Sequence, residues 1–200
     1  MTLLMNGQAP DFTASAIMDD NILDDNFNFR DYIKDKIGIL FFWPFDFSDV
    51  CPSEVIAFNN RFDKFSERGC KIVGCSVDSH YSHYTWKNTP ISEGGIGKVR
   101  FPLVADAGGI ISEGYGVISK NRVAYRATFV IDETGKVIHQ SVYDFTIGRN
   151  VDEVLRIVDA LLYTKAHKGS CPASWKKGDR GIENTRKSVK KFLSENADKL

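Results

Sequence analysis

A continuous apolar run in the first quarter of the chain gives its clearest secondary-structure signal. Residues 37–43 read Ile-Gly-Ile-Leu-Phe-Phe-Trp, the pattern of a strand that is covered on both faces. Residues 70–77 and 101–106 predict two further strands. Between the first two strands, apolar residues recur at helical spacing and predict one helix that ends at Gly69, with its apolar face formed by Val55, Phe58, Phe62 and Phe65.

Helical and strand patterns alternate through the rest of the first 165 residues. Ser79 is a suitable cap for a helix that runs toward Trp86 and ends at Pro90, and a second helix is expected around residues 110–115. A hairpin turn, Asp132-Glu133-Thr134-Gly135, then separates two β-rich runs at 126–132 and 136–142.

A last helix is predicted where Asn150 and Glu153 resemble a capping box, and it continues through Leu162. Strand–helix alternation, a hairpin and a final helix form the order expected of an α/β protein, a thioredoxin-like sandwich. From about residue 166 the sequence becomes polar and rich in Lys, so it cannot build a core of its own. We therefore expect a domain over residues 1–165 and a C-terminal arm over 166–200 that packs on something else, such as a second subunit.

Charge and composition narrow the class of function. Lys plus Arg and Asp plus Glu both number 26, so no net field draws the chain toward nucleic acid or an acidic membrane. The first residues lack the basic region and apolar run of a signal peptide, and no stretch has the length of a membrane span. These features predict a cytoplasmic protein, or one whose transit peptide has been removed.

The cysteines suggest redox chemistry rather than a structural framework. Four occur, at positions 51, 70, 75 and 171, and no Cys-x-x-Cys is present, which argues against a thioredoxin-type dithiol and a zinc knuckle. In a reducing compartment any pairing would be transient and catalytic. Cys70 and Cys75 lie in a predicted buried strand, where cysteine usually serves as a small apolar side chain.

Cys51 has the surroundings of a reactive thiol. It follows a strand that breaks at Pro44, and Pro52 suits the first position of a helix because it has no backbone N–H to leave unpaired. Unpaired amides and the positive end of the helix dipole would favour a thiolate there. The hydroxyl of Ser48 could hydrogen-bond the sulfur or an oxygen bound to it. The alternative interpretation is a small buried cysteine without reactivity.

The pattern Pro44-x-x-x-Ser48-x-x-Cys51-Pro52 resembles the peroxide-reducing signature of the peroxiredoxins. Five other segments resemble segments of the same family, in the same order: 7–12, 76–80, 125–132, 148–153 and 169–175. The last of them, residues 169–175, is similar to the resolving-cysteine motif of the typical two-cysteine subgroup. The resemblance, which covers nearly the whole chain, implies a thiol-dependent peroxidase of the alkyl hydroperoxide reductase and thiol-specific antioxidant type.

The resemblance also implies the site residues. Cys51 would attack the peroxide and become a sulfenic acid, Arg126 would hold the thiolate and a peroxide oxygen, and Glu54 would orient that arginine. Pro44 would shield the sulfur and Ser48 would supply the hydroxyl for which relatives more often use Thr. Cys171 is the resolving cysteine that the resemblance places in the active site of a partner subunit.

The implied assembly is a homodimer, with a decamer of five dimers as the expected higher form. The implied electron donor is an external dithiol, either a thioredoxin-like protein or a dedicated flavoprotein disulfide reductase, and the enzyme itself needs no metal, haem or flavin. Two alternatives belong to other classes of function: a holdase chaperone, and a protein disulfide oxidoreductase, against which the missing Cys-x-x-Cys argues.

Several positions depart from the family or have two interpretations. Asp49 stands where relatives more often have an aromatic residue, so its carboxylate either points to solvent or weakens the activation of Cys51. Trp43 replaces a usual Tyr but keeps a donor. Arg149 matches a second family arginine, although a solvated residue before a helix is an equal alternative. His80 and His83 could form half of a metal site, but we expect them on an exposed helix face.

Overall fold

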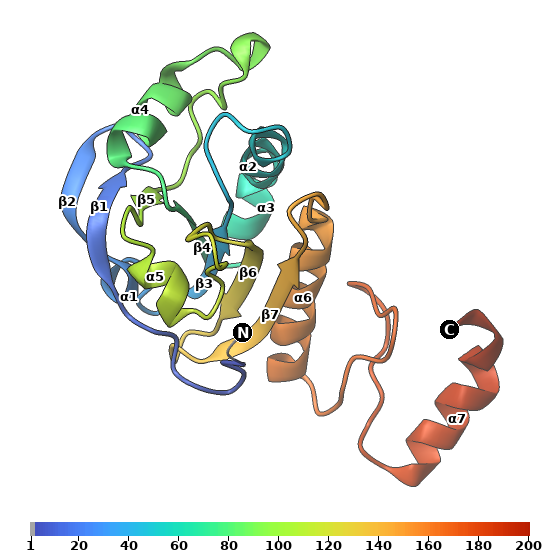
Figure 1. The fold of residues 1–200 in the computed structure, drawn as a ribbon. Coiled ribbons are helices and arrows are strands. Elements are labelled where there is room, and N and C mark those ends of the chain that lie inside the picture. The colour runs from blue at the N-terminus through green and yellow to red at the C-terminus, as the bar shows by residue number, and fades with distance from the viewer. Residues whose placement is uncertain (1–2) are drawn as a thin grey trace. The chain divides into compact units, whose positions relative to one another are not determined.

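The computed structural model describes residues 3–200, with the exception of the Lys199 side chain, and contains a seven-stranded sheet. The strands lie in the order β2-β1-β5-β4-β3-β6-β7 (Figure 1). Their bounds are β1 Thr13–Ile17, β2 Leu23–Asn28, β3 Ile37–Phe42, β4 Cys70–Ser76, β5 Leu103–Ala105, β6 Arg126–Ile131 and β7 Val137–Tyr143. The three central strands β3, β4 and β5 are parallel, and the flanking strands pair antiparallel.

Five of the described helices lie between strands along the chain, and α6 and α7 follow the last strand. They are α1 Phe29–Tyr32, α2 Cys51–Asn60, α3 Phe62–Ser66, α4 His80–Asn88, α5 Ile110–Gly114, α6 Val151–Ala166 and α7 Arg186–Asn196, with short 3-10 turns at Ile91–Glu93 and Ala197–Lys199. Contacts divide the chain into two compact units, residues 1–151 and 152–200. This division falls in the first turn of α6, whereas the sequence suggested a boundary at residue 165, which stays a prediction.

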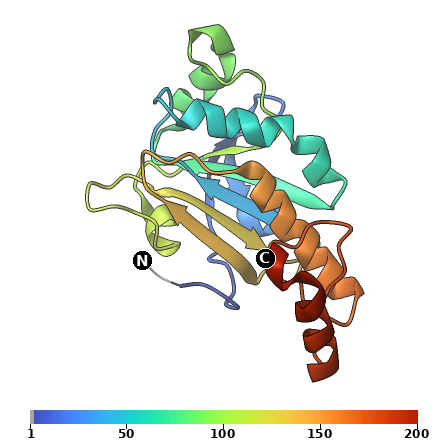
Figure 2. The same ribbon diagram turned by 90° about the vertical axis from the view of Figure 1, so that its right-hand side faces the viewer.

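Each face of the sheet has its own core, because alternate residues of a strand point to opposite sides. On one face Leu40, Phe42 and Phe129 pack with Tyr115 and the residues around α1 and α5. On the other face the ring of Phe41 stacks on Phe58 of α2 at 4.2 Å between centroids. Figure 2 shows α2 and α3 lying along this second face. The sheet therefore places the N-terminus of α2 close to the C-terminal end of β3.

Most predicted elements are confirmed, with small shifts at their ends. Ser79 caps α4 by accepting a hydrogen bond from the Ser82 amide at 3.3 Å. The β6–β7 hairpin closes at Gly135, whose φ of 83° is the left-handed conformation that the turn requires. The prediction of one helix ending at Gly69 is wrong, because the chain breaks at Arg61 (φ −107°, ψ 7°) and forms α2 and α3 instead.

Candidate active site

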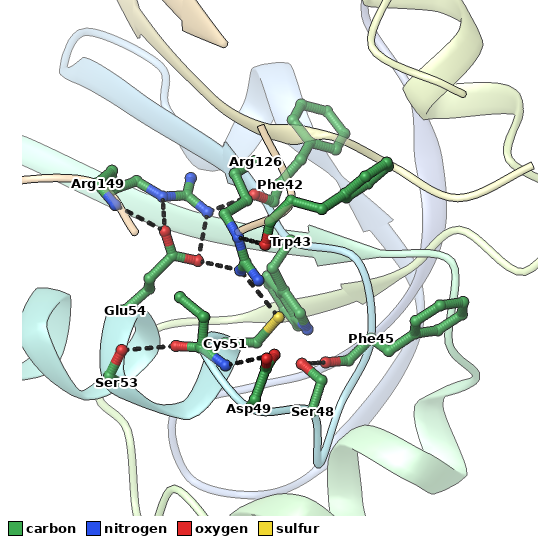
Figure 3. A network of polar contacts seen from close by, with 12 residues as sticks. Phe42, Trp43, Phe45, Ser48, Asp49, Cys51, Ser53, Glu54, Arg126 and Arg149 are labelled. Carbon is green, nitrogen blue, oxygen red and sulfur yellow. Dashed lines mark hydrogen bonds and ion pairs between the residues drawn. The ribbon is translucent and has the colours of Figure 1, made fainter. Parts of the chain in front are cut away.

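Cys51 is the first residue of α2, and its side chain is fully buried. The chain reaches it through a loop that leaves β3 at Phe42, the residue paired with Ala127 of the antiparallel strand β6. Arg126, the residue before Ala127, consequently begins its strand beside this loop. Its Nη1 lies 3.1 Å from the Cys51 sulfur (Figure 3). The pairing of β3 with β6 thus brings together two residues that are far apart in sequence.

Glu54 holds Arg126 in this position. One turn into α2, its Oε2 accepts a hydrogen bond from Arg126 Nη1 at 2.7 Å, and both side chains are only 2% exposed. Arg126 also donates from Nε to the carbonyl oxygen of Phe145 at 2.9 Å. The guanidinium is therefore fixed between a carboxylate, a carbonyl group and the sulfur, as the sequence analysis expected for an orienting Glu54.

Arg149 is buried and completes the charge balance of the site (Figure 3). Its Nε donates to Glu54 Oε1 at 2.8 Å, its Nη2 to Glu54 Oε2 at 3.0 Å, and its backbone N–H to Oε1 at 3.0 Å. Nη2 also donates to the carbonyl oxygen of Phe42 at 2.6 Å, at the end of β3. Of the two interpretations of Arg149, the structure excludes the solvated residue and supports the residue near the pocket.

Burial and charge have opposite effects on these groups. Burial by itself would raise the pKa of Glu54, but the hydrogen bonds and charge of Arg149, with the charge of Arg126, hold that pKa below its ordinary value. Burial would likewise lower the pKa of Arg126, yet its contacts with Cys51 and Glu54 raise it. Both residues are therefore charged, and a positive group faces the buried sulfur.

The loop residues before Cys51 differ in part from expectation. Ser48 Oγ donates to the carbonyl oxygen of Phe45 at 2.9 Å, so its proton is directed away from the sulfur that it was expected to contact. Asp49 is exposed, and its carboxylate accepts the Val50 N–H at 2.8 Å, which selects the solvent-facing alternative. Pro44 is buried at the start of the loop. Trp43 keeps a donor, since its Nε1 donates to Asp46 at 3.0 Å.

A buried polar pair that the sequence analysis missed anchors this loop. Asp46 Oδ2 lies 2.8 Å from Nδ1 of His83, which is 0% exposed, so the expectation of an exposed His83 is wrong. Nε2 of His83 lies 3.1 Å from the carbonyl oxygen of Val104. Both ring nitrogens of His83 therefore have a polar partner in the core, and the Asp46 contact ties the loop to α4.

The pattern of α4 could have revealed this pair. His83 and Trp86 are three residues apart and therefore share a face of the helix, and Trp86 is fully buried. Residues 3–200 contain no group of three or more His, Cys, Asp or Glu side chains placed to hold a metal ion. Within the same residues no helix combines the length and apolar character that crossing a bilayer requires.

Cys171 lies in the second compact unit, in the segment between α6 and α7. It is half-buried, and like Cys51, Cys70 and Cys75 it is present as a thiol rather than in a disulfide. Cys70 and Cys75 are buried, and burial raises the pKa of Cys75 well above its ordinary value, with the charge of Asp106 adding to the effect. This thiol is therefore protonated and sealed in the core, in agreement with a structural side chain.

A buried cysteine at a helix start, held against an arginine on a thioredoxin-like sheet, defines a thiol-dependent peroxidase. The comparisons with known proteins identify the group. The sequence model of the AhpC/TSA family matches residues 5–140, and the chain belongs to this family.

Two curated relatives and one solved structure extend the match over nearly the whole chain. Alkyl hydroperoxide reductase C of Helicobacter pylori is 46% identical over 198 residues, 99% of this chain and 100% of the relative. Thioredoxin peroxidase of Echinococcus granulosus is 40% identical, covering 97% of this chain and 100% of that protein. The reduced 2-Cys peroxiredoxin of Plasmodium vivax has a TM-score of 0.92 at 40% identity, covering 96% of this chain and 100% of that structure.

Proposed function

We propose that Cys51 reduces hydrogen peroxide and organic hydroperoxides through a sulfenic acid, and that Cys171 of a partner subunit resolves it. The observation that carries the first half is the 3.1 Å contact between Arg126 Nη1 and the Cys51 sulfur. A guanidinium at this distance favours the thiolate, which is the nucleophilic form of cysteine.

The thiolate attacks one peroxide oxygen, the O–O bond breaks, and water or an alcohol leaves after taking up a proton. Arg126 has a fork of donors and would hold the peroxide oxygen next to the sulfur while negative charge moves onto the leaving oxygen. Ser48 donates its own proton to the carbonyl oxygen of Phe45, so toward the peroxide it would act as a hydrogen-bond acceptor. Pro44 would exclude water from the sulfur, and Glu54 positions Arg126.

The resolving step forms a disulfide between subunits. The thiol of Cys171 condenses with the sulfenic acid of Cys51 and water leaves. An external dithiol protein, thioredoxin-like or a flavoprotein reductase, then reduces the disulfide. The name of the Echinococcus relative, thioredoxin peroxidase, supports the first of these donors. We propose the cytoplasm as the compartment, because free cysteines that pair only during turnover suit a reducing environment.

The assembly proposed is a homodimer that associates to a decamer. β7 is an edge strand of the sheet; its first residue, Val137, binds the backbone of Asn6 and Gly7, and we propose that the rest of the strand pairs with a second copy. A separate set of exposed aromatic rings surrounds the loop before Cys51 and the start of α4: Phe45, Phe47, Tyr81 and Tyr84. Large exposed aromatic surfaces of this kind mark interaction sites, which supports a second contact between dimers.

Peroxide consumption by cysteine variants tests the proposal. Cys51→Ser should abolish turnover, because serine cannot form a thiolate at this position. The matched controls Cys70→Ser and Cys75→Ser remove buried thiols of β4 and should keep nearly full activity. Turnover that persists in Cys51→Ser would refute the mechanism.

A further inference from the structure

The segment that carries Cys171 lies against one face of α6. The Cys171 sulfur donates a weak hydrogen bond to the carbonyl oxygen of Ala160, at 3.8 Å. Ala160 follows Arg156 by four residues, so the two share a face of the helix. The resolving thiol is thus placed over the side of α6 from which Arg156 projects.

Arg156 is held from both sides on this face. Its Nε and Nη2 donate to the two carboxylate oxygens of Glu153 at 2.6 and 2.7 Å, a bidentate ion pair. Its Nη1 donates to the carbonyl oxygen of Trp175 at 3.3 Å. Trp175 lies four residues after Cys171, so the same guanidinium binds the loop that contains the thiol.

Other side chains around the Cys171 loop form ring contacts, hydrogen bonds and ion pairs with one another. The ring of Tyr163 packs against Trp175 at 5.1 Å, and its hydroxyl accepts the Gly181 N–H at 2.8 Å. The ring of His167 also stacks on Tyr163, at 4.2 Å between centroids. The charged neighbours are the Asp159–Lys177 pair, at 3.9 Å, and Asp179, whose carboxylate accepts the Lys176 N–H at 2.8 Å.

Two opposing effects act on the thiol in this setting. Burial raises the pKa of Cys171 above its ordinary value, and the positive charge of Arg156 works in the opposite direction. Because a thiolate attacks a sulfenic acid far faster than a thiol does, the balance between these effects governs the resolving step.

We propose that Arg156 is a positioning residue for the resolving reaction, holding the Cys171–Trp175 loop on α6 and favouring the thiolate of Cys171. The inference rests on the proposed function only in taking Cys171 as the resolving cysteine. In the reaction the Cys171 thiol first releases its proton, the thiolate forms the S–S bond as the S–O bond of the Cys51 sulfenic acid breaks, and the hydroxide that leaves takes up a proton to become water. The sulfenic acid is the oxidant, so no further reactant is needed.

A variant with Cys171 as its single thiol isolates the effect from peroxide chemistry. In a Cys51→Ser, Cys70→Ser, Cys75→Ser background, the rate of alkylation by iodoacetamide is measured by mass spectrometry between pH 6 and 10.5. Adding Arg156→Gln should move the midpoint of this profile upward by about half a unit to one unit, which lowers the rate at pH 7.5 by roughly three- to tenfold. Arg156→Lys restores the charge and should keep the original midpoint.

The matched control is Arg122→Gln, which removes an exposed arginine paired with Glu113 in the other compact unit and should change nothing. Glu153→Gln provides a second, independent variant should Arg156→Gln unfold. It keeps the arginine but removes the neighbouring negative charge, so the midpoint should fall. An unchanged midpoint in Arg156→Gln, or a raised midpoint in Glu153→Gln, would overturn the proposal.

With the other cysteines present, Arg156→Gln should slow disulfide formation after a peroxide pulse by the same factor, while sulfenic acid formation on Cys51 keeps its rate. If Cys171 does not resolve Cys51, the alkylation profiles still shift and no intersubunit disulfide forms. Failure of the proposed function is thereby distinguished from failure of this inference.

Discussion

Arg126 lies between the Cys51 sulfur, at 3.1 Å, and the Glu54 carboxylate, at 2.7 Å. One guanidinium nitrogen contacts both, so the orientation of the donor is fixed before peroxide arrives. A lysine would retain the charge, but it lacks the planar fork and the Nε bond to Phe145. The activity should therefore depend on the shape of the donor as well as on its charge.

Arg126→Lys tests this dependence. We expect the second-order rate of Cys51 with hydrogen peroxide to fall about 100-fold, the typical effect of losing one oriented donor. The rate is measured as peroxide consumed in a single turnover. Arg100→Lys is the matched control, since it alters an exposed arginine that pairs with Asp63, and it should leave the rate unchanged. A rate near wild type in Arg126→Lys would show that charge alone suffices.

Glu54 should link the site to the stability of the protein. Its pKa in the folded state is below the ordinary value. The contacts of the ionised carboxylate therefore stabilise the folded protein fully when the pH is above the ordinary pKa, and this stabilisation is lost as the pH falls through the folded-state pKa. Glu54→Gln leaves two buried arginines without their carboxylate and should cost roughly 3–5 kcal/mol at pH 7. The cost should shrink toward pH 3.

Urea unfolding at pH 7 and at acidic pH measures this difference. The control is Glu67→Gln, a carboxylate on the exposed surface. A Glu54→Gln cost that stays constant across this pH range would contradict the assigned ionisation of Glu54.

At the scale of elements, the regular parts of the fold were predictable and the loop contacts were not. β3, β4 and the β6–β7 hairpin follow from apolar runs and from the turn at Gly135, because burial on both faces leaves a direct signature in the sequence. The β1–β2 pair was not predicted, since β2 reads Leu-Asp-Asp-Asn-Phe-Asn and is mostly polar. Its position depends on pairing with β1, which the local sequence does not encode.

Some contacts of the candidate site were likewise predictable from the sequence, and others were not. The resemblance to a family motif predicted Cys51, Arg126 and Glu54 as site residues, and the structure brings their side chains into contact. The burial of His83 and the direction of the Ser48 hydroxyl were not found, because each depends on a partner that tertiary structure supplies: Asp46 for the first and the Phe45 carbonyl group for the second.

Lys87 provides a test of the packing between elements, because it lies in the contact between α4 and the β1–β2 turn. It is 2% exposed, and its Nζ donates to the carbonyl oxygen of Met18. Burial lowers its pKa to about 8, so folding is penalised below that pH and the penalty disappears as the pH rises toward the ordinary value of 10.5.

Lys87→Met should therefore stabilise the protein at pH 7 by roughly 1–2 kcal/mol, less than the full charge penalty because the Met18 carbonyl group loses its donor. The gain should vanish near pH 10.5. Thermal unfolding at pH 7 and pH 10 measures it, with exposed Lys64→Met as the control. A loss of stability at pH 7 would show that the hydrogen bond outweighs the buried charge.

At the scale of the whole molecule, the two compact units each carry one half of the proposed thiol chemistry, with Cys51 in residues 1–151 and Cys171 in residues 152–200. We expect the oxidised protein to run as a covalent dimer on non-reducing gels and Cys171→Ser to run as a monomer. Cys70→Ser is the control and should still form the dimer. A disulfide found by mass spectrometry within one chain would exclude resolution between subunits.

The tryptophans of the two units offer optical probes for separate steps of the cycle. Trp43 donates to Asp46 in the loop before Cys51, and Trp86 packs 5.9 Å from its ring, whereas Trp175 lies four residues after Cys171. Opening of the loop before Cys51 would move the indole N–H of Trp43 from the buried Asp46 carboxylate into water. The fluorescence emission of Trp43 should change when this happens. Replacing tryptophans in pairs by phenylalanine would leave one fluorophore at a time, so that the movement of each thiol could be followed without a label.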